Sequence, residues 1–121
     1  MEELYTQAYL SYQCGDYETS KRLFTELIAK DPMEKAYWIG LASTSQMQKE
    51  FSQSSYGWAI VQFLDPENPD PYLHAAECLL SLGQKEEAQK ALKEGKQKAS
   101  HNKDLLEKME NLLQEGNTSC Q

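Results

Sequence analysis

Two stretches of the sequence, YETSKRLFTELIAKDP at 17–32 and FSQSSYGWAIVQFLDP at 51–66, match at one fixed offset. Four of their positions pair at a spacing of 34 residues: Tyr17 with Phe51, Ser20 with Ser54, Phe24 with Trp58, and Pro32 with Pro66. A third copy follows at the same step, with Trp38 matching Tyr72 and Ala42 matching Ala76. Independent positions seldom share one offset by chance, so the chain contains an internal repeat.

A repeat of this length is the period of the tetratricopeptide unit, which is a pair of helices joined by a turn. The copies predict an all-α protein with three such repeats, at about 1–34, 35–68 and 69–100. We expect the helix pairs to stack into a right-handed α-solenoid with a concave peptide groove. A capping helix at about 103–115 should cover the end of the stack with five apolar residues: Leu105, Leu106, Met109, Leu112 and Leu113. Residues 1–116 then form one domain, and 117–121 form a flexible tail.

Glycine and proline residues predict where the helices begin and end. The first helix should stop at Gly15, as should its counterpart at Gly83, because glycine adopts the left-handed conformation that ends many helices. Lys49 stands at the same place in the second repeat, so that turn should be either strained or differently shaped. The proline-rich stretch 65–71 should break the chain until a helix resumes at Tyr72. Gly116 should end the last helix.

Composition and charge limit the partners. The chain has 19 acidic residues against 12 Lys and Arg, and its net charge of −7 repels nucleic acid and anionic lipid. It has neither an apolar run near the length of a membrane span nor a charged-then-apolar leader. We therefore expect a cytoplasmic protein with no nucleic-acid partner and no stable membrane association. An odd number of cysteines, Cys14, Cys78 and Cys120, predicts free thiols.

No residue pattern predicts catalysis. His74 and Cys78 lie four apart on one expected helix, but no third ligand is near in sequence, so we expect neither a metal site nor a catalytic pair. A glycine-rich phosphate loop and a nucleophile elbow are missing as well, which predicts a protein that is not an enzyme and needs no cofactor. Trp38 and Trp58 occupy expected core positions. The four lysines of the helix at 85–98 are expected on its solvated face: Lys90, Lys93, Lys96 and Lys98.

The third repeat carries a more specific pattern. The stretch PYLHAAECLL at 71–80 resembles the signature of the class II type III secretion chaperones, which are the translocator chaperones. Supporting stretches resemble the same family along most of the chain: LYTQAY at 4–9, YQCGDY at 12–17, YWIGL at 37–41 and SYG at 55–57.

This resemblance implies a function. Members of the family bind hydrophobic translocator proteins in the bacterial cytoplasm, keep them from associating prematurely and present them for secretion. The cargo is an extended segment whose spaced proline and leucine anchors lie in the groove. The family usually has a further segment before the first repeat that is implicated in self-association, whereas Met1 here lies almost inside the first helix. A homodimer therefore stays an open alternative.

Helical spacing predicts which residues face the groove. Residues at i, i+4 and i+7 share one face of a helix, and the first helix of each repeat supplies the inner face of the stack. Tyrosines on this face offer rigid contact area and a hydroxyl that can bond an extended backbone. The predicted peptide-binding groove consists of Tyr5, Tyr9, Tyr12, Ile39, Ser43, Gln46, Leu73, Glu77 and Leu80. Alternatively, the tyrosines only pack against an upstream helix.

Two other classes of binding protein are alternatives to this interpretation. A module that clamps a C-terminal carboxylate needs Lys and Asn on the inner face near the positions that Tyr5 and Tyr9 occupy here, so this class is close to excluded. A tetratricopeptide adaptor, or a regulatory protein that binds a transcription factor, has no distinguishing sequence pattern. That alternative stays open beside cargo binding.

Overall fold

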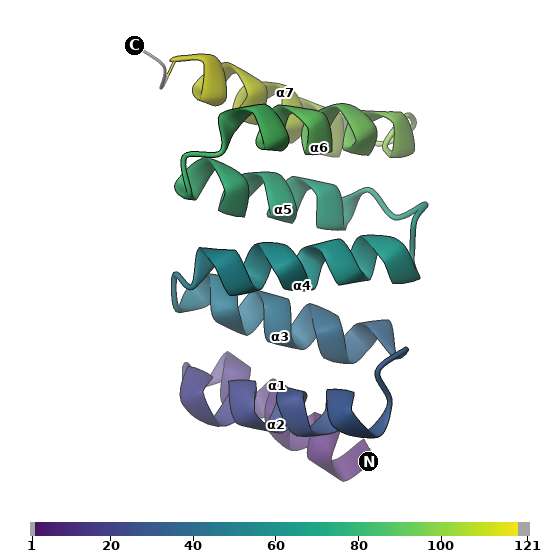
Figure 1. The fold of residues 1–121 in the computed structure, drawn as a ribbon. Coiled ribbons are helices and arrows are strands. Elements are labelled where there is room, and N and C mark those ends of the chain that lie inside the picture. The colour runs from purple at the N-terminus through teal and green to yellow at the C-terminus, as the bar shows by residue number, and fades with distance from the viewer. Residues whose placement is uncertain (1, 119–121) are drawn as a thin grey trace.

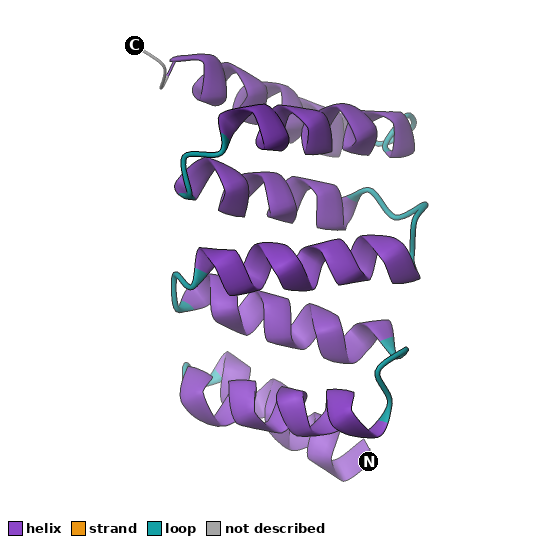
Figure 2. Ribbon diagram, in the orientation of Figure 1, coloured by secondary structure: helices purple, strands orange, loops and turns teal. Residues whose placement is uncertain are grey.

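The computed structural model describes residues 2–118, which form seven helices and no strand (Figures 1 and 2). The helices are α1 (Glu2–Gln13), α2 (Tyr17–Lys30), α3 (Lys35–Met47), α4 (Phe51–Leu64), α5 (Asp70–Ser81), α6 (Lys85–Lys98) and α7 (Lys103–Thr118). Each helix packs against the next one in the chain, and the stack grows in one direction from the N-terminus to the C-terminus. The predicted all-α class is confirmed. None of the described helices is long and apolar enough to cross a membrane.

The turns inside the three helix pairs have the same shape. The φ angles of Gly15, Lys49 and Gly83 are +83°, +61° and +78°. In each turn this residue donates its N–H to the carbonyl three residues back, at 3.0–3.1 Å, and the next residue donates to the carbonyl five back. That pair of bonds is the Schellman motif, which closes a helix through a left-handed residue. Lys49 therefore adopts the strained conformation, and the second turn is not differently shaped.

Two predicted helix ends were wrong. α5 begins at Asp70, so Pro71 lies within its first turn and the helix does not wait for Tyr72. A proline is tolerated there because the first N–H groups of a helix have no partner within it. α7 continues to Thr118, past Gly116, because a glycine destabilises a helix interior by only about 1 kcal/mol and does not force a stop. The rest of the predicted tail, 119–121, lies outside the described residues.

Three buried clusters form the core along the stack. The small residue shared by the repeats, Ala8, Ala42 or Ala76, is fully buried in each cluster. Trp58 lies in the second cluster as predicted, but Trp38 is only half-buried at its edge. The third cluster includes residues of α7, with Leu105 and Met109 buried and three partly buried leucines packed around them: Leu106, Leu112 and Leu113. α7 therefore covers the end of the stack as predicted.

The prediction that all four lysines of α6 face solvent is wrong for two of them. Lys90 and Lys93 are exposed, whereas Lys96 pairs with Glu110 of α7 and Lys98 pairs with Glu67 before α5, at 3.3 Å. The repeat period could not show these ion pairs, because it relates equivalent positions and does not tell which side chains of different segments meet.

We predict that Lys49→Gly stabilises the protein by about 1 kcal/mol, because glycine removes the strain of a left-handed non-glycine residue. Lys49 is exposed, so the substitution removes no buried contact. Urea unfolding followed by circular dichroism measures the change. Gly83→Ala, which introduces the same strain at the equivalent turn, should destabilise by a similar amount. Equal stability of wild type and Lys49→Gly would mean that the turn carries no strain.

Candidate peptide-binding groove

Three neighbouring hollows run along the helices α1, α3 and α5. The first, called the tyrosine hollow, measures about 80 Å³ and is lined by Tyr5, Tyr9, Tyr12, Phe24, Ala36, Ile39, Gly40 and Ser43. The central hollow measures about 190 Å³ and is lined by Tyr12, Ser43, Gln46, Met47, Trp58, His74 and Glu77. The third, of about 210 Å³, is called the α7 hollow and is lined by Leu73, Glu77, Lys108, Asn111 and Leu112.

Shared residues join these hollows into one path. Tyr12 and Ser43 line both the tyrosine hollow and the central hollow, and Glu77 lines both the central hollow and the α7 hollow. All of the predicted groove residues except Leu80 line at least one of the three. The structure therefore brings together side chains that the sequence places in three separate repeats.

The tyrosines of α1 have different environments. The ring of Tyr5 packs against Phe24 of α2 and Tyr37 of α3, with ring centres 6.1 and 5.8 Å away, so Tyr5 belongs partly to the core. The ring of Tyr9 stacks on Tyr5 and is 48% exposed. Burial is the largest cause that raises the pKa of Tyr12, and the nearby Tyr17 and Tyr9 raise it through electrostatic interactions. The Tyr12 hydroxyl therefore stays protonated at neutral pH. Of these three tyrosines, Tyr9 therefore offers the most accessible aromatic surface, and Tyr12 offers a hydroxyl that can donate or accept.

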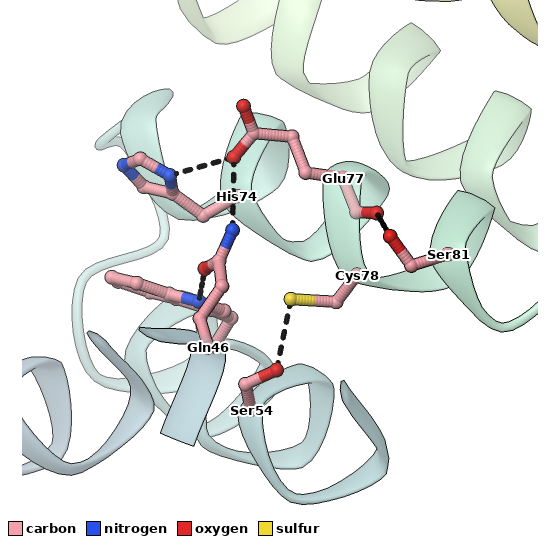
Figure 3. Close-up of polar contacts among 7 residues, drawn as sticks. Gln46, Ser54, His74, Glu77, Cys78 and Ser81 are labelled. Carbon is pink, nitrogen blue, oxygen red and sulfur yellow. Dashed lines mark hydrogen bonds and ion pairs between the residues drawn. The ribbon is translucent and has the colours of Figure 1, made fainter. Parts of the chain in front are cut away.

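A polar network forms the wall of the central hollow (Figure 3). The indole ring of Trp58 stacks on His74 at 4.6 Å, and its Nε1 donates to Gln46 Oε1 at 2.8 Å. Gln46 Nε2 in turn donates to Glu77 Oε1 at 3.2 Å, and His74 Nδ1 lies 3.1 Å from the same oxygen. These four side chains come from α3, α4 and α5, and they hold one another in a single arrangement.

The Glu77 carboxylate puts a negative charge at the centre of the groove. Burial raises the pKa of Glu77. Three neighbours together outweigh this effect: His74 through a hydrogen bond and its charge, Gln46 through a hydrogen bond, and Lys108 through its charge. The net pKa of Glu77 therefore lies below the usual value. Glu77 is therefore ionised at neutral pH. The groove combines aromatic surface at α1 with a hydrogen-bond acceptor near its middle.

At the α7 hollow, the lining of the groove differs from the sequence-based prediction. Leu73 is 7% exposed and belongs to the third core cluster, and Leu80 packs partly buried against the same cluster. Two lining residues that the sequence analysis did not include come from α7: Lys108 and Asn111. The repeat period gives no signal for them, because α7 lies outside the repeats.

Two other lining residues have a role that their sequence pattern does not indicate. The repeat predicts Trp58 in the core, and it is only 4% exposed, yet it also lines the central hollow. The spacing of His74 and Cys78 bears only on metal binding or catalysis, whereas His74 contacts Trp58 and Glu77. The described residues contain no cluster that could hold a metal ion.

The described cysteines behave as free thiols. Cys14 is exposed, and Cys78 is buried with its sulfur 2.9 Å from Ser54 Oγ. Burial raises the pKa of the Cys78 thiol, the hydrogen bond with Ser54 opposes this effect, and the charge of Glu77 adds to it. A buried, protonated thiol is a poor nucleophile, so Cys78 and His74 are not a catalytic pair. Cys120 lies outside the described residues.

Comparison with known proteins agrees with the fold. A family model described as "Tetratricopeptide repeat" matches residues 62–115. The solved structure of the type III secretion translocator chaperone SycD from Yersinia enterocolitica superposes with a TM-score of 0.90 and 26% identity, covering 98% of this chain and 83% of SycD. The chain therefore has a tetratricopeptide-like fold. The predicted resemblance to translocator chaperones is confirmed. SycD is a chaperone, which agrees with the prediction of a binding protein rather than an enzyme.

Two further relatives extend the comparison. Low calcium response locus protein H of Yersinia pestis is 30% identical over 92 residues, which is 76% of this chain and 55% of that protein. The chain thus spans about half the length of the curated relatives it matches. SycD in complex with a peptide of the translocator YopD shares the fold, with a TM-score of 0.89 and 24% identity over 99% of this chain and 94% of SycD.

The lowered pKa of Glu77 leads to a prediction about pH. Because the folded-state pKa lies below the unfolded one, the ionised carboxylate stabilises the fold above the unfolded pKa, and this contribution disappears as the pH falls through the folded pKa. Glu77→Gln should lower the unfolding free energy at pH 7 by a few tenths of a kcal/mol, the scale of a partly exposed pair. Urea unfolding of both proteins from pH 7 to pH 3 should show this difference shrinking. Glu86→Gln, at an exposed position of α6, is the control.

Proposed function

We propose that this protein is a cytoplasmic chaperone of a bacterial type III secretion system, which binds a hydrophobic translocator protein and keeps it soluble and ready for secretion. It would hold an extended, apolar segment of the translocator in the groove along α1, α3 and α5. SycD, which shares this fold, has been crystallised in complex with a peptide of the translocator YopD, and this supports a translocator segment as the ligand. The alternative of a general adaptor has no observation in its favour.

The continuous path through the three hollows carries this proposal. Packed helices lie about 8–10 Å apart and an extended chain rises about 3.3 Å per residue, so roughly three residues would cross from α1 to α3, which are in contact. An extended segment suits such a path because its side chains can enter successive hollows while its backbone stays accessible. The proposed contacts are Tyr5, Tyr9, Tyr12, Ile39, Ser43, Gln46, Leu73, Glu77 and Leu80.

The chemistry of the path suggests how the segment is held. Tyr9 and Ile39 offer apolar surface in the tyrosine hollow, which suits a proline or leucine anchor. In the central hollow, Glu77 and the Tyr12 hydroxyl can bond the N–H groups that an extended backbone leaves unpaired. Leu73 and Leu80 would contribute less, because the third core cluster already covers most of their surface. The tyrosines of α1 should therefore dominate the affinity.

Self-association remains a prediction for this chain. SycD has been solved in more than one dimeric arrangement, as its alternative dimer shows. The proposed groove lies within one chain and does not need a partner copy to be complete.

Co-expression tests the proposal. With the apolar secreted proteins encoded beside its gene, the wild-type protein should convert one of them from insoluble to soluble and copurify with it. Tyr9→Ala should weaken this complex by about 2 kcal/mol or more, which is roughly thirtyfold in dissociation constant, because a central aromatic contact is lost. Its helical content and melting temperature should stay nearly unchanged, since half of the ring is exposed.

Lys90→Ala serves as the control, because Lys90 is exposed on α6 and does not line the path. This variant should bind as the wild type does. Loss of folding in Tyr9→Ala would show that the tyrosines are structural. Normal binding by both variants would place the cargo on another surface.

A further inference from the structure

Trp58 is a core residue whose polar atom serves the wall of the groove. It belongs to the second core cluster, but the equivalent positions in the first and third repeats hold Phe24 and Leu92. Both of these side chains are buried, and neither has a polar atom. Filling the core at this position therefore does not require an indole. The N–H group is what distinguishes Trp58 from its two counterparts.

The hydrogen bond of this N–H determines how the Gln46 amide is oriented. The indole nitrogen of Trp58 can only donate, so the amide atom that faces it at 2.8 Å must be the oxygen Oε1. The amide nitrogen then points to the Glu77 carboxylate, 3.2 Å away (Figure 3). An ionised carboxylate can only accept, so both neighbours require the same orientation. A rotated amide would place donor against donor on one side and acceptor against acceptor on the other.

His74 supplies the second donor to Glu77. Its Nδ1 lies 3.1 Å from Oε1, the same oxygen that accepts from Gln46. The imidazole ring stacks on the Trp58 indole, so Trp58 supports both donors. Because these two bonds end at Oε1, the second oxygen of the carboxylate can accept a bond from a ligand. The Glu77 side chain is 41% exposed and lines two hollows of the groove, so a ligand can reach it.

The bond between Trp58 and Gln46 has no equivalent in the other two repeats. The corresponding pairs of residues are Tyr12 with Phe24 and Leu80 with Leu92. Neither pair combines an indole N–H with an amide, so neither can form this bond. The middle of the groove therefore has a support from the core that the repeat pattern does not supply elsewhere.

Such a support matters for binding because free side chains lose rotamer freedom when a ligand orders them. Glutamine and glutamate are among the side chains with the most rotamer freedom to lose. Here the hydrogen bonds within the protein already restrict Gln46 and Glu77. A ligand that bonds the Glu77 carboxylate then avoids much of this ordering cost.

We propose that Trp58 is a positioning residue of the groove, which acts through the Gln46 amide to hold the Glu77 carboxylate ready to accept a backbone N–H of the cargo. This role rests on the function proposed above, because it concerns how the central hollow binds an extended segment. Trp58 acts through its neighbour and not through its own surface, of which only 4% is exposed.

The first measurement needs no cargo. Trp58→Phe keeps a buried ring that can stack on His74 and removes the N–H donor. The Gln46 amide then loses its fixed orientation, and the pKa of Glu77, which the bond from Gln46 lowers, should rise. Carbon-13 NMR of the Glu77 carboxyl group across pH measures this pKa in the full chain. A residue that only fills the core would leave it unchanged.

Two further variants keep this measurement decisive. Trp38→Phe is the matched control, because the Trp38 indole donates to the Pro32 carbonyl at 2.7 Å and lines none of the three hollows of the groove. This control should leave both the pKa of Glu77 and cargo binding unchanged. Gln46→Leu removes the amide at a half-buried position and should raise the pKa of Glu77 even if Trp58→Phe fails to fold.

The second measurement uses cargo. The probes are fluorescein-labelled peptides that together span the translocator copurified in the co-expression experiment. Trp58→Phe should weaken the peptide that binds most tightly by about fivefold, the scale of one hydrogen bond. In a Gln46→Leu background the same substitution should cause no further loss, because the positioning acts through the amide.

Three outcomes would overturn the positioning role of Trp58. One is a Glu77 pKa that Trp58→Phe leaves unchanged, and another is unchanged cargo affinity of this variant. The third is a loss of affinity that is equal with and without the Gln46 amide, because Trp58 would then shape the hollow directly. If no translocator copurifies, the proposed function fails, and the pKa of Glu77 still decides whether Trp58 positions the carboxylate.

Discussion

The close approach of neighbouring helices is the constraint on which the structure depends. A Cβ at Gly40 would lie 2.3 Å from the ring of Phe24, and one at Gly57 would lie 2.9 Å from the Cβ of Ala42. Helices can pack so closely only where one of them presents glycine or alanine, which explains why Ala8, Ala42 and Ala76 are fully buried. The same closeness lets the Ser20 hydroxyl donate to the Ala8 carbonyl while lying 3.2 Å from Thr44 Oγ1, so that one atom joins three helices.

The groove follows from this packing. Because α1 and α3 lie side by side, Tyr12 and Ser43 reach the same two hollows, and the path continues to α5 through Glu77. Its middle is polar and its first part is aromatic, which combines hydrogen bonding to a backbone with surface for apolar anchors. Hydrogen bonds within the protein hold Gln46, Trp58, His74 and Glu77 in one arrangement, so binding of cargo would cost little ordering of these side chains.

Helix α3 borders hollows on two of its sides. Ile39, Ser43 and Gln46 line the groove, whereas Trp38, Leu41 and Ser45 line a separate hollow between α2 and α4. A helix in the middle of a stack is covered on two sides by its neighbours and keeps two faces open, and here both open faces carry aromatic or polar side chains next to cavities. The strained residue Lys49 lies two positions after the last residue of this helix. Its turn has the shape of the glycine turns because the backbone hydrogen bonds that close α3 require it.

The sequence by itself determined the repeat, the helices and most of the candidate groove. These features are periodic, so the step of 34 residues and the spacing within each helix predict them from positions such as Tyr5, Tyr9 and Ser43. Only the tertiary structure decided what lies between repeats and beyond them. Lys108 reaches the groove from α7, His74 stacks on Trp58, and Ser45 is left without a partner at a junction. Such contacts depend on distances between side chains from different helices, and a one-dimensional period contains no information about them.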